Sequence, residues 1–154
     1  MTYDVIGNSV NRLDAVAKVT GKAKYADDYF ERDMLIGKVL RSPYAHAIIK
    51  NIDVSRAKAL AGVEAVITHK DLPKIKFATA GHPWSLDPGH RDVEDRLILT
   101  DKARFVGDAI AAVVAVDELT AEKALKLIEV EYEILPFVID PEEAIKEGAP
   151  IIHE

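Results

Sequence analysis

The chain contains no cysteine, and this absence excludes several classes of protein. Without a thiol there is no disulfide scaffold, no thiol nucleophile, no zinc site built on cysteine and no iron–sulfur cluster held by thiolates. A chain without cysteine suits a reducing compartment, so the expected location is the cytoplasm.

Long apolar runs are also missing. The longest, from Ala109 to Val116, has eight residues, whereas a helix that crosses a bilayer needs about 20. No basic stretch followed by an apolar stretch opens the chain, so no secretory signal is expected. The net charge is −6, from 26 acidic and 20 basic residues, which disfavours nucleic acid and anionic membrane surfaces as partners.

The common phosphate-binding and hydrolase motifs are absent as well. Gly21-Lys22 resembles the end of a phosphate loop, but that loop needs glycine where Val16 stands and Ser or Thr where Ala23 stands. No G-x-G-x-x-G and no G-x-S-x-G occurs anywhere. Dinucleotide binding and α/β-hydrolase chemistry therefore lack their usual signatures.

What is present is a globular composition, with 154 residues, 49% hydrophobic and 30% charged, which predicts one α+β domain. Hydrophobic patterns predict strands over residues 34–40, 46–52, 63–68, 109–116 and 129–135. Short helices are expected with Asp53 or Ser55, with Asp117 or Thr120, and with Asp140 as the N-cap residue. A strand, an aspartate, a short helix and a second strand thus occur twice, which indicates two β-α-β units.

Three details of these elements can be compared with a structure. Ile48 and Ile52 are expected on one face of their strand. Gly62 is expected directly after the helix that follows this strand. The run from Ala109 to Val116 is apolar on both faces, which is typical of a strand covered on both sides. The segment from Glu129 to Leu135 alternates, so its glutamates are expected on a solvated face rather than as a pair sharing a proton.

A long loop is predicted over residues 74–95, where glycine, proline and histidine recur without a hydrophobic period. In this loop Trp84, together with Phe77 and Leu86, either lines a pocket or interface or anchors the loop to the core. The loop also contains possible metal ligands, but their spacing fits no preformed element, and a solvated acidic loop is the favoured interpretation. These ligands are His82, Asp87, His90, Asp92 and Glu94.

The remaining histidines, His46, His69 and His153, are isolated in sequence and are expected at the surface or at a strand edge. From the residues alone, the chain is therefore a compact domain with no catalytic constellation.

Eight short blocks follow one another along the chain: Arg12–Ala15, Lys18–Tyr25, Gly37–Ala47, Ile52–Asp53, Gly62–Val63, Asp71–Pro73, Phe105–Asp108 and Val130–Pro136. As an ordered set, spanning about Ile6 to Pro141, they resemble the amino-terminal part of the molybdenum-binding subunit of the xanthine dehydrogenase and aldehyde oxidase family. The resemblance implies an α/β-hammerhead domain, which has two β-α-β units with additional strands.

The resemblance also implies a larger enzyme. Members of this family hydroxylate a carbon–hydrogen bond with water at molybdenum held by molybdopterin, and pass electrons to 2Fe-2S clusters and FAD on partner subunits or domains. The family's cofactor-binding stretches and active-site glutamate lie in later domains, and no position here matches them. No catalytic, cofactor-binding or metal-binding residue is therefore expected in this chain.

The chain is accordingly expected to be a single hammerhead domain over residues 1–154, with an extended segment over residues 1–30. It would be a fragment of a molybdenum hydroxylase that acts on xanthine, another purine or an aldehyde. Its role would be scaffolding, it would be inactive alone, and its partners would be the remaining domains and the iron–sulfur and flavin subunits. The alternative is a free-standing, non-enzymatic binding module with the same fold.

Some residues in the blocks that resemble the family are expected to have structural roles. Arg41 and His46 flank Pro43, where they are expected to fix the connection or to contact the next domain, and Gly107 is expected in a turn. In the family, the connection that corresponds to the long loop approaches the substrate entrance. Phe77, Trp84 and Leu86 are therefore candidates for a role in specificity.

Overall fold

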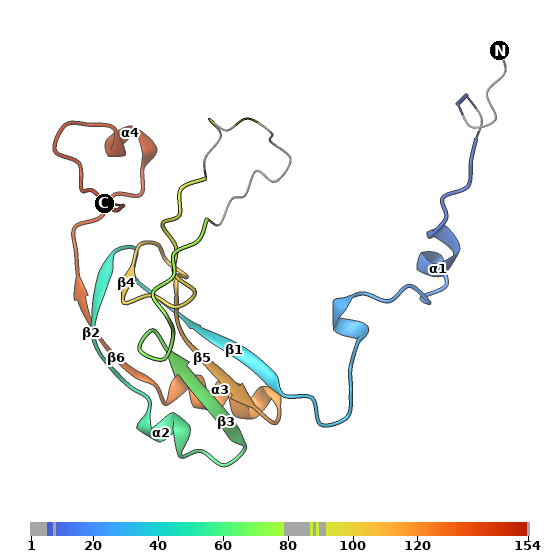
Figure 1. Cartoon of the computed structure of the whole chain (residues 1–154), viewed down its shortest axis with the longest axis horizontal. Helices are drawn as coiled ribbons and strands as arrows, with labels where there is room; N and C mark the ends of the chain where they lie inside the picture. The colour runs from blue at the N-terminus through green and yellow to red at the C-terminus, as the bar shows by residue number, and fades with distance from the viewer. Residues whose placement is uncertain (1–5, 8, 79–86, 88, 90–91, 154) are drawn as a thin grey trace. The chain divides into compact units, whose positions relative to one another are not determined.

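The computed structural model describes residues 6–7, 9–78, 87, 89 and 92–153 (Figure 1). The chain divides into two units, Met1–Met34 and Leu35–Glu154. The first unit contains α1 (Ala15–Val19) and the 3-10 turn η1 (Ala26–Asp28). The second contains β1 (Ile36–Arg41), β2 (Ala47–Asp53), α2 (Ser55–Lys58), β3 (Val63–Thr68), β4 (Lys102–Ala103), β5 (Ala109–Ala115), α3 (Glu118–Lys126), β6 (Glu129–Ile134) and α4 (Pro141–Ala144).

The sequence predicted an extended amino-terminal segment. The structure differs, because α1 and η1 form within it. Before α1, the Asp14 carboxylate lies 2.6 Å from the ammonium group of Lys18, four residues later. This spacing places the two charges on one side of a helical turn. Neither α1 nor η1 buries a side chain, so tertiary packing within the unit contributes little to their stability.

The second unit contains two three-stranded antiparallel sheets. Sheet A has the strand order β1-β5-β3, and sheet B has the order β4-β2-β6. The two predicted β-α-β units are β2-α2-β3 and β5-α3-β6, but the strands within each unit do not pair with each other. Instead β2 pairs with β6 and β3 pairs with β5, so each sheet takes one strand from each unit.

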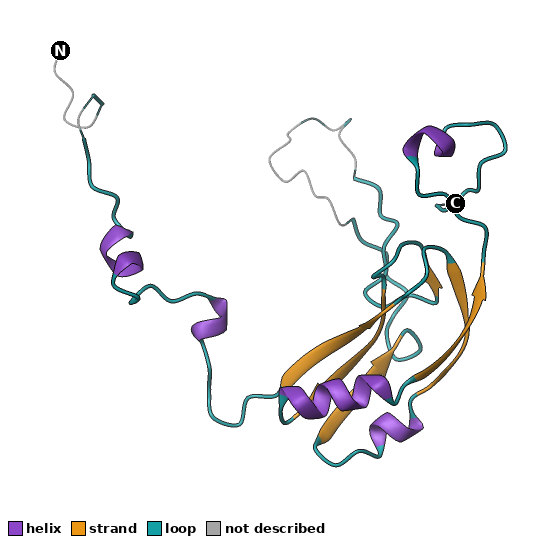
Figure 2. Cartoon of the chain, turned by 180° about the vertical axis from the view of Figure 1, so that it is seen from behind, coloured by secondary structure: helices purple, strands orange, loops and turns teal. Residues whose placement is uncertain are grey.

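The core forms where β5, at the centre of sheet A, meets the helices. Ile110, Ala111, Val113 and Ala115 of β5 are buried, and Ala121 and Ala124 of α3 are buried in the same cluster. Alanine on both sides lets the helix backbone approach the sheet closely. Figure 2 shows α2 and α3 together on one side of sheet A.

A β-bulge in β2 determines which side chains of sheet B enter this core. The pairing of β2 with β6 shifts register between Ile49 and Asn51, so Lys50 is the extra residue. A bulge moves the following side chains to the opposite face. Ile49 and Ile52 are therefore the buried pair, at 7% exposure each. The prediction that Ile48 and Ile52 share a face is wrong, because strict alternation does not allow for the bulge.

Helix boundaries agree with the sequence where a cap side chain is present. Asp117 caps α3, because its carboxylate accepts a hydrogen bond from the Thr120 amide at 2.7 Å. In α2, which follows β2, the N-cap residue is Val54 and the last helical residue is Lys58. Gly62 was predicted directly after the helix. It lies instead in the turn that leads into β3.

That turn still requires glycine. Gly62 has a φ of +87°, and a Cβ atom there would lie 2.9 Å from Cγ2 of Val116 and 3.3 Å from Cγ2 of Thr120. Both the left-handed backbone and the close approach exclude a side chain. The turn is also bonded to β5, because the Val116 amide donates to the Gly62 carbonyl at 2.9 Å. In the part of the chain that the structure describes, no helix has the length and hydropathy needed to cross a bilayer.

Candidate functional site

A polar junction joins the two sheets at one end of the second unit. It consists of the connection Arg41–His46 between β1 and β2 and the turn Phe105–Asp108 before β5. The Ser42 amide donates to the Asp108 carbonyl at 2.8 Å, and the Gly107 amide donates to the Ser42 carbonyl at 2.8 Å. Ser42 is buried, so these bonds satisfy backbone groups that water cannot reach.

Two of the residues singled out in the sequence, Arg41 and Gly107, meet in this junction. The Arg41 guanidinium donates to the Gly107 carbonyl at 2.9 Å. Gly107 has a φ of +96°, and a Cβ atom there would have no neighbour within 4 Å. The requirement for glycine at this turn is therefore conformational and not a matter of space.

His46 is the third of these residues, and it is 4% exposed. It was expected at the surface or at a strand edge, and the surface position is wrong, because the connection folds it under the end of β6. Its ring Nδ1 lies 2.7 Å from the Pro136 carbonyl, and a carbonyl only accepts, so Nδ1 carries the proton. The His46 carbonyl accepts from the Leu135 amide at 2.9 Å. Together the two bonds fix the direction in which the chain leaves β6.

Nε2 of His46 is buried and has no hydrogen-bond partner among the described residues. In the neutral ring with a proton on Nδ1, this nitrogen is an acceptor. In the same connection, Tyr44 stacks edge to face with Tyr132 of β6, with centroids 5.0 Å apart, and burial raises the pKa of Tyr132. The site around His46 is thus a packed structural one.

Asp108 and Arg96 complete the junction, although no motif in the sequence connects them. The Asp108 carboxylate accepts from the Arg104 amide at 3.0 Å and from the Ala109 amide at 3.1 Å. The Arg96 guanidinium lies 3.9 Å from this carboxylate and 4.4 Å from the ring centroid of Phe105. Asp108 stands in a recognised block, but no pattern in the sequence marks Arg96.

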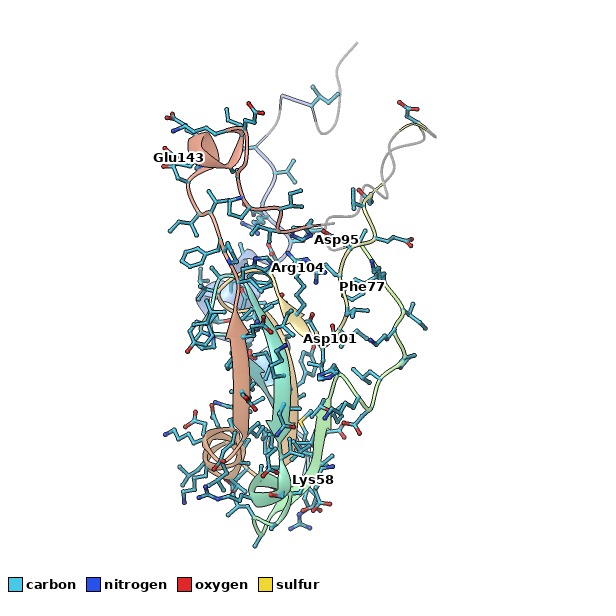
Figure 3. All side chains as sticks on the ribbon, turned by 90° about the vertical axis from the view of Figure 1, so that its left-hand side faces the viewer. Lys58, Phe77, Asp95, Asp101, Arg104 and Glu143 are labelled. Carbon is cyan, nitrogen blue, oxygen red and sulfur yellow. The ribbon has the colours of Figure 1, made fainter. Side chains whose placement is uncertain are left out.

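Arg96 also ties the long loop to the junction. The Phe77 amide donates to the Arg96 carbonyl at 2.9 Å, and the Arg96 amide donates back at 3.2 Å. A second contact joins His153 to Asp95, with 2.8 Å between Nδ1 and the carboxylate. Figure 3 shows Phe77, Asp95 and Arg104 toward one end of the strands and Lys58 at the other end.

Of the loop residues expected to affect specificity, Phe77 is 39% exposed, while Trp84 and Leu86 lie outside the described residues. The possible metal ligands His82 and His90 lie outside them too. His153 is partly exposed and His69 half-buried, so the expected surface position holds for His153 more fully than for His69.

The described residues contain no cluster of potential metal ligands. Within them no group of three or more His, Asp or Glu side chains is close enough to hold a metal ion. On β6, Glu129 pairs with Arg56 at 2.8 Å and Glu133 pairs with Lys50. These glutamates are exposed and paired with cations, so they form a solvated face, as predicted.

Comparisons with known proteins agree with this description. Residues 20–136 match the family model for the aldehyde oxidase and xanthine dehydrogenase a/b hammerhead domain. The xanthine dehydrogenase molybdenum-binding subunit of Escherichia coli O157:H7 is 51% identical over 142 residues, which are 92% of this chain and 19% of that protein. The nicotinate dehydrogenase large molybdopterin subunit of Eubacterium barkeri is 38% identical over 98% of this chain and 33% of that protein.

Among solved structures, the aldehyde oxidoreductase from Desulfovibrio desulfuricans superposes with a TM-score of 0.82 and 35% identity, over 96% of this chain and 16% of that one. The chain spans about a fifth to a third of the length of the curated relatives named above. The expected family and hammerhead fold are confirmed. The chain belongs to the aldehyde oxidase and xanthine dehydrogenase family, in which it corresponds to the α/β-hammerhead domain.

Proposed function

We propose that this chain is the hammerhead domain of the large subunit of a molybdenum hydroxylase, and that it acts as a scaffold for the catalytic domains. One observation carries the proposal: nearly the whole chain aligns with only 19% of a molybdenum-binding subunit. The chemistry is assigned to the rest of such a subunit, about four-fifths of which lies outside the region that matches this chain. The chain alone is expected to be inactive.

For the complete protein we propose hydroxylation of a purine such as xanthine, with an aldehyde as the alternative substrate. The relatives are named for xanthine, nicotinate and aldehyde, and xanthine has priority because that relative is the most similar of the three. Molybdenum held by molybdopterin supplies the oxidising chemistry when it is bound in the other domains. Partner subunits or domains with 2Fe-2S clusters and FAD would receive the electrons, and the assembly would lie in the cytoplasm.

The junction has a positioning role in this proposal. Arg41, Gly107 and His46 fix the β1–β2 connection and the exit from β6 through hydrogen bonds of 2.7–2.9 Å. They would thereby orient the domain relative to its neighbours. The loop over residues 74–95, with Phe77, Trp84 and Leu86, would contribute to the substrate entrance. Arg96 would hold the base of this loop through its backbone hydrogen bonds with Phe77.

The loop can be tested by exchange. Replacing residues 74–95 of the complete enzyme with the loop of an aldehyde-specific relative should change the ratio of kcat/KM for xanthine and aldehyde substrates. Molybdenum content should not change. An unchanged ratio in an enzyme with full molybdenum content would remove the loop from the entrance.

The scaffold proposal is tested by isolating the native polypeptide from the source cells with an antibody to this domain, and measuring its mass and molybdenum content. A polypeptide several times longer than 154 residues, or a tightly bound partner, should carry molybdenum. A native chain of 16.9 kDa that travels alone without molybdenum would instead establish a free-standing binding module.

A further inference from the structure

On the side of sheet A that faces away from α3, the middle of the sheet carries only aliphatic residues, and Arg41 stands on the same side at the end of β1. On β1, the ammonium group of Lys38 lies 2.6 Å from the carboxylate of Glu118 and 2.7 Å from that of Glu122, both on α3. Since side chains alternate along a strand, Val39 points to the opposite side. The sheet register then defines which residues of β5 and β3 share that side.

Two rows of residues cross the sheet there. One row aligns Val39 with Ala112 and Ile67, and the other aligns Gly37 with Val114 and Ala65. We call these six residues the aliphatic face: Gly37, Val39, Ala65, Ile67, Ala112 and Val114. In a chain that is 30% charged, the face contains no charged and no polar side chain.

The β1 edge of this face is accessible in the structure, and its residues on β3 and β5 are partly exposed. Val39 is 40% exposed, and a Cβ atom built on Gly37 would have no neighbour within 4 Å. The helices that pack on sheet A, α2 and α3, lie on the other side (Figure 2). An antiparallel sheet with one solvated face normally alternates apolar and polar residues, and β5 does not.

We propose that the aliphatic face is a docking surface, and that it packs against an aliphatic surface of the remaining part of the same molybdenum subunit. This inference rests on the proposed function. The region that matches this chain is 19% of the xanthine dehydrogenase subunit and 16% of the aldehyde oxidoreductase chain. More than four-fifths of each relative's polypeptide is thus available to supply the covering surface.

The size of the face favours this occupant over a second copy. A stable protein–protein interface buries about 20 to 30 residues on each side, whereas the aliphatic face has six. A domain in the same polypeptide is held nearby at high effective concentration, so it needs far less contact area to stay docked.

The chemistry of the face points the same way. A charged partner would lose its hydration against six aliphatic residues and find no counter-charge there. Gly37, Ala65 and Ala112 leave the face nearly flat, and this lets another layer of secondary structure approach closely. The missing cover is therefore an apolar layer, like the one that α3 provides on the opposite side.

The test measures the accessibility of one thiol in two proteins. Val39→Cys is introduced into the 154-residue chain, which has no cysteine of its own, and into the complete subunit. Maleimide labelling is followed by mass spectrometry of the peptide that contains position 39. The control, Lys123→Cys, is on the exposed side of α3 and is labelled in the same way.

We expect the Val39→Cys thiol to react readily in the 154-residue chain and at least tenfold more slowly in the complete subunit, with Lys123→Cys labelled in both. Equal rates in a molybdenum-containing subunit would overturn the docking surface while leaving the scaffold proposal intact. If labelling of the 154-residue chain is slow only at high protein concentration, a second copy covers the face. If it is slow at every concentration, another segment of this chain covers the face. Either result overturns the inference. A native chain of only 154 residues that travels alone without molybdenum would overturn both proposals.

Discussion

The two sheets of the second unit have the same size and contribute to the same core, but their outer faces differ. The outer face of sheet A carries six aliphatic residues, whereas that of sheet B, beside Ile48, is polar and mostly charged. The polar residues are Lys50, Asn51, Asp53, Glu129, Glu131 and Glu133. Since both faces lie in one small unit, the difference is not a consequence of overall composition.

The difference shows which face is built for water. On sheet B, alternation on β6 puts Val130 and Tyr132 toward the core and glutamates outward. On sheet A, β5 has apolar residues in both directions. An exposed apolar patch of this kind marks an interaction site, so this domain is a component that is completed by what packs on sheet A.

The largest effect should separate two neighbouring residues of β5. Val113 is 0% exposed in the core, while Val114 is on the aliphatic face. In the 154-residue chain, Val113→Asp should prevent folding, because an unpaired buried charge costs several kcal/mol. Val114→Asp should cost only about 1 kcal/mol, since its carboxylate stays in water.

Urea unfolding followed by circular dichroism measures both variants. In the complete subunit the difference should shrink, because Val114→Asp then places a charge inside the proposed interface. If the two variants were equally destabilised in the 154-residue chain, the two faces of β5 would be equivalent, contrary to the comparison.

The next effect compares two glycines of sheet A. Gly62→Ala should lower the free energy of unfolding by about 2 kcal/mol or more, because it forces alanine into a left-handed backbone and against Val116. Gly37→Ala should raise it slightly, by up to about 1 kcal/mol, since the strand is open above it. Thermal unfolding of both variants provides the measurement, and a stabilised Gly62→Ala would contradict the close approach.

On sheet B, the salt bridge between Lys50 and Glu133 should contribute little. Both side chains are about half exposed, at 54% and 45%, so a double-mutant cycle with alanine should give a coupling below about 1 kcal/mol. The coupling should fall further in 1 M salt because exposed charges are screened. A coupling of several kcal/mol that resists salt would mean that this face is not solvated.

The smallest effect depends on pH at the end of β3. Burial lowers the pKa of His69 below its ordinary 6.5, with Lys70 and Lys74 acting in the same direction and Asp101 and Asp71 opposing. The unfolded chain therefore takes up this proton more readily than the folded one. Stability from this group is present above pH 6.5 and declines as the pH falls below it.

Urea unfolding at pH 7.5 and pH 5.5 tests this. The loss of stability on acidification should be smaller in His69→Gln than in the unchanged chain. Aspartates whose pKa is lowered by hydrogen bonds, such as Asp53 and Asp117, titrate below this range. An equal loss in the two proteins would show that His69 does not carry the dependence.

Several elements of the fold could be predicted because their signals are local. The Asp117 cap is formed by atoms three residues apart, and the alternation of β6 is visible in its own six residues. The two β-α-β units recur in the sequence for the same reason. Ile49 was missed because a bulge at Lys50 depends on how β2 aligns with β6, 80 residues away in the chain.

The candidate site was predictable only in part. Gly107 and Arg41 stand in recognisable blocks, but their contact joins residues 66 positions apart. His46 was expected at the surface or at a strand edge because a single histidine in a polar stretch gives no sign of burial. Arg96 was not found at all, since its partners Phe105 and Asp108 come together only when the long loop folds back.

By itself, the sequence determined the family, the recurrence of the β-α-β pattern and the two-sided apolar character of β5. Each of these depends only on short local stretches or on their order along the chain. The tertiary structure decided how the units exchange strands, which of the isoleucines in β2 are buried, and which side of β5 the helices cover. Those outcomes depend on pairing between distant segments, and hydrophobic periodicity within one segment contains no information about its partner.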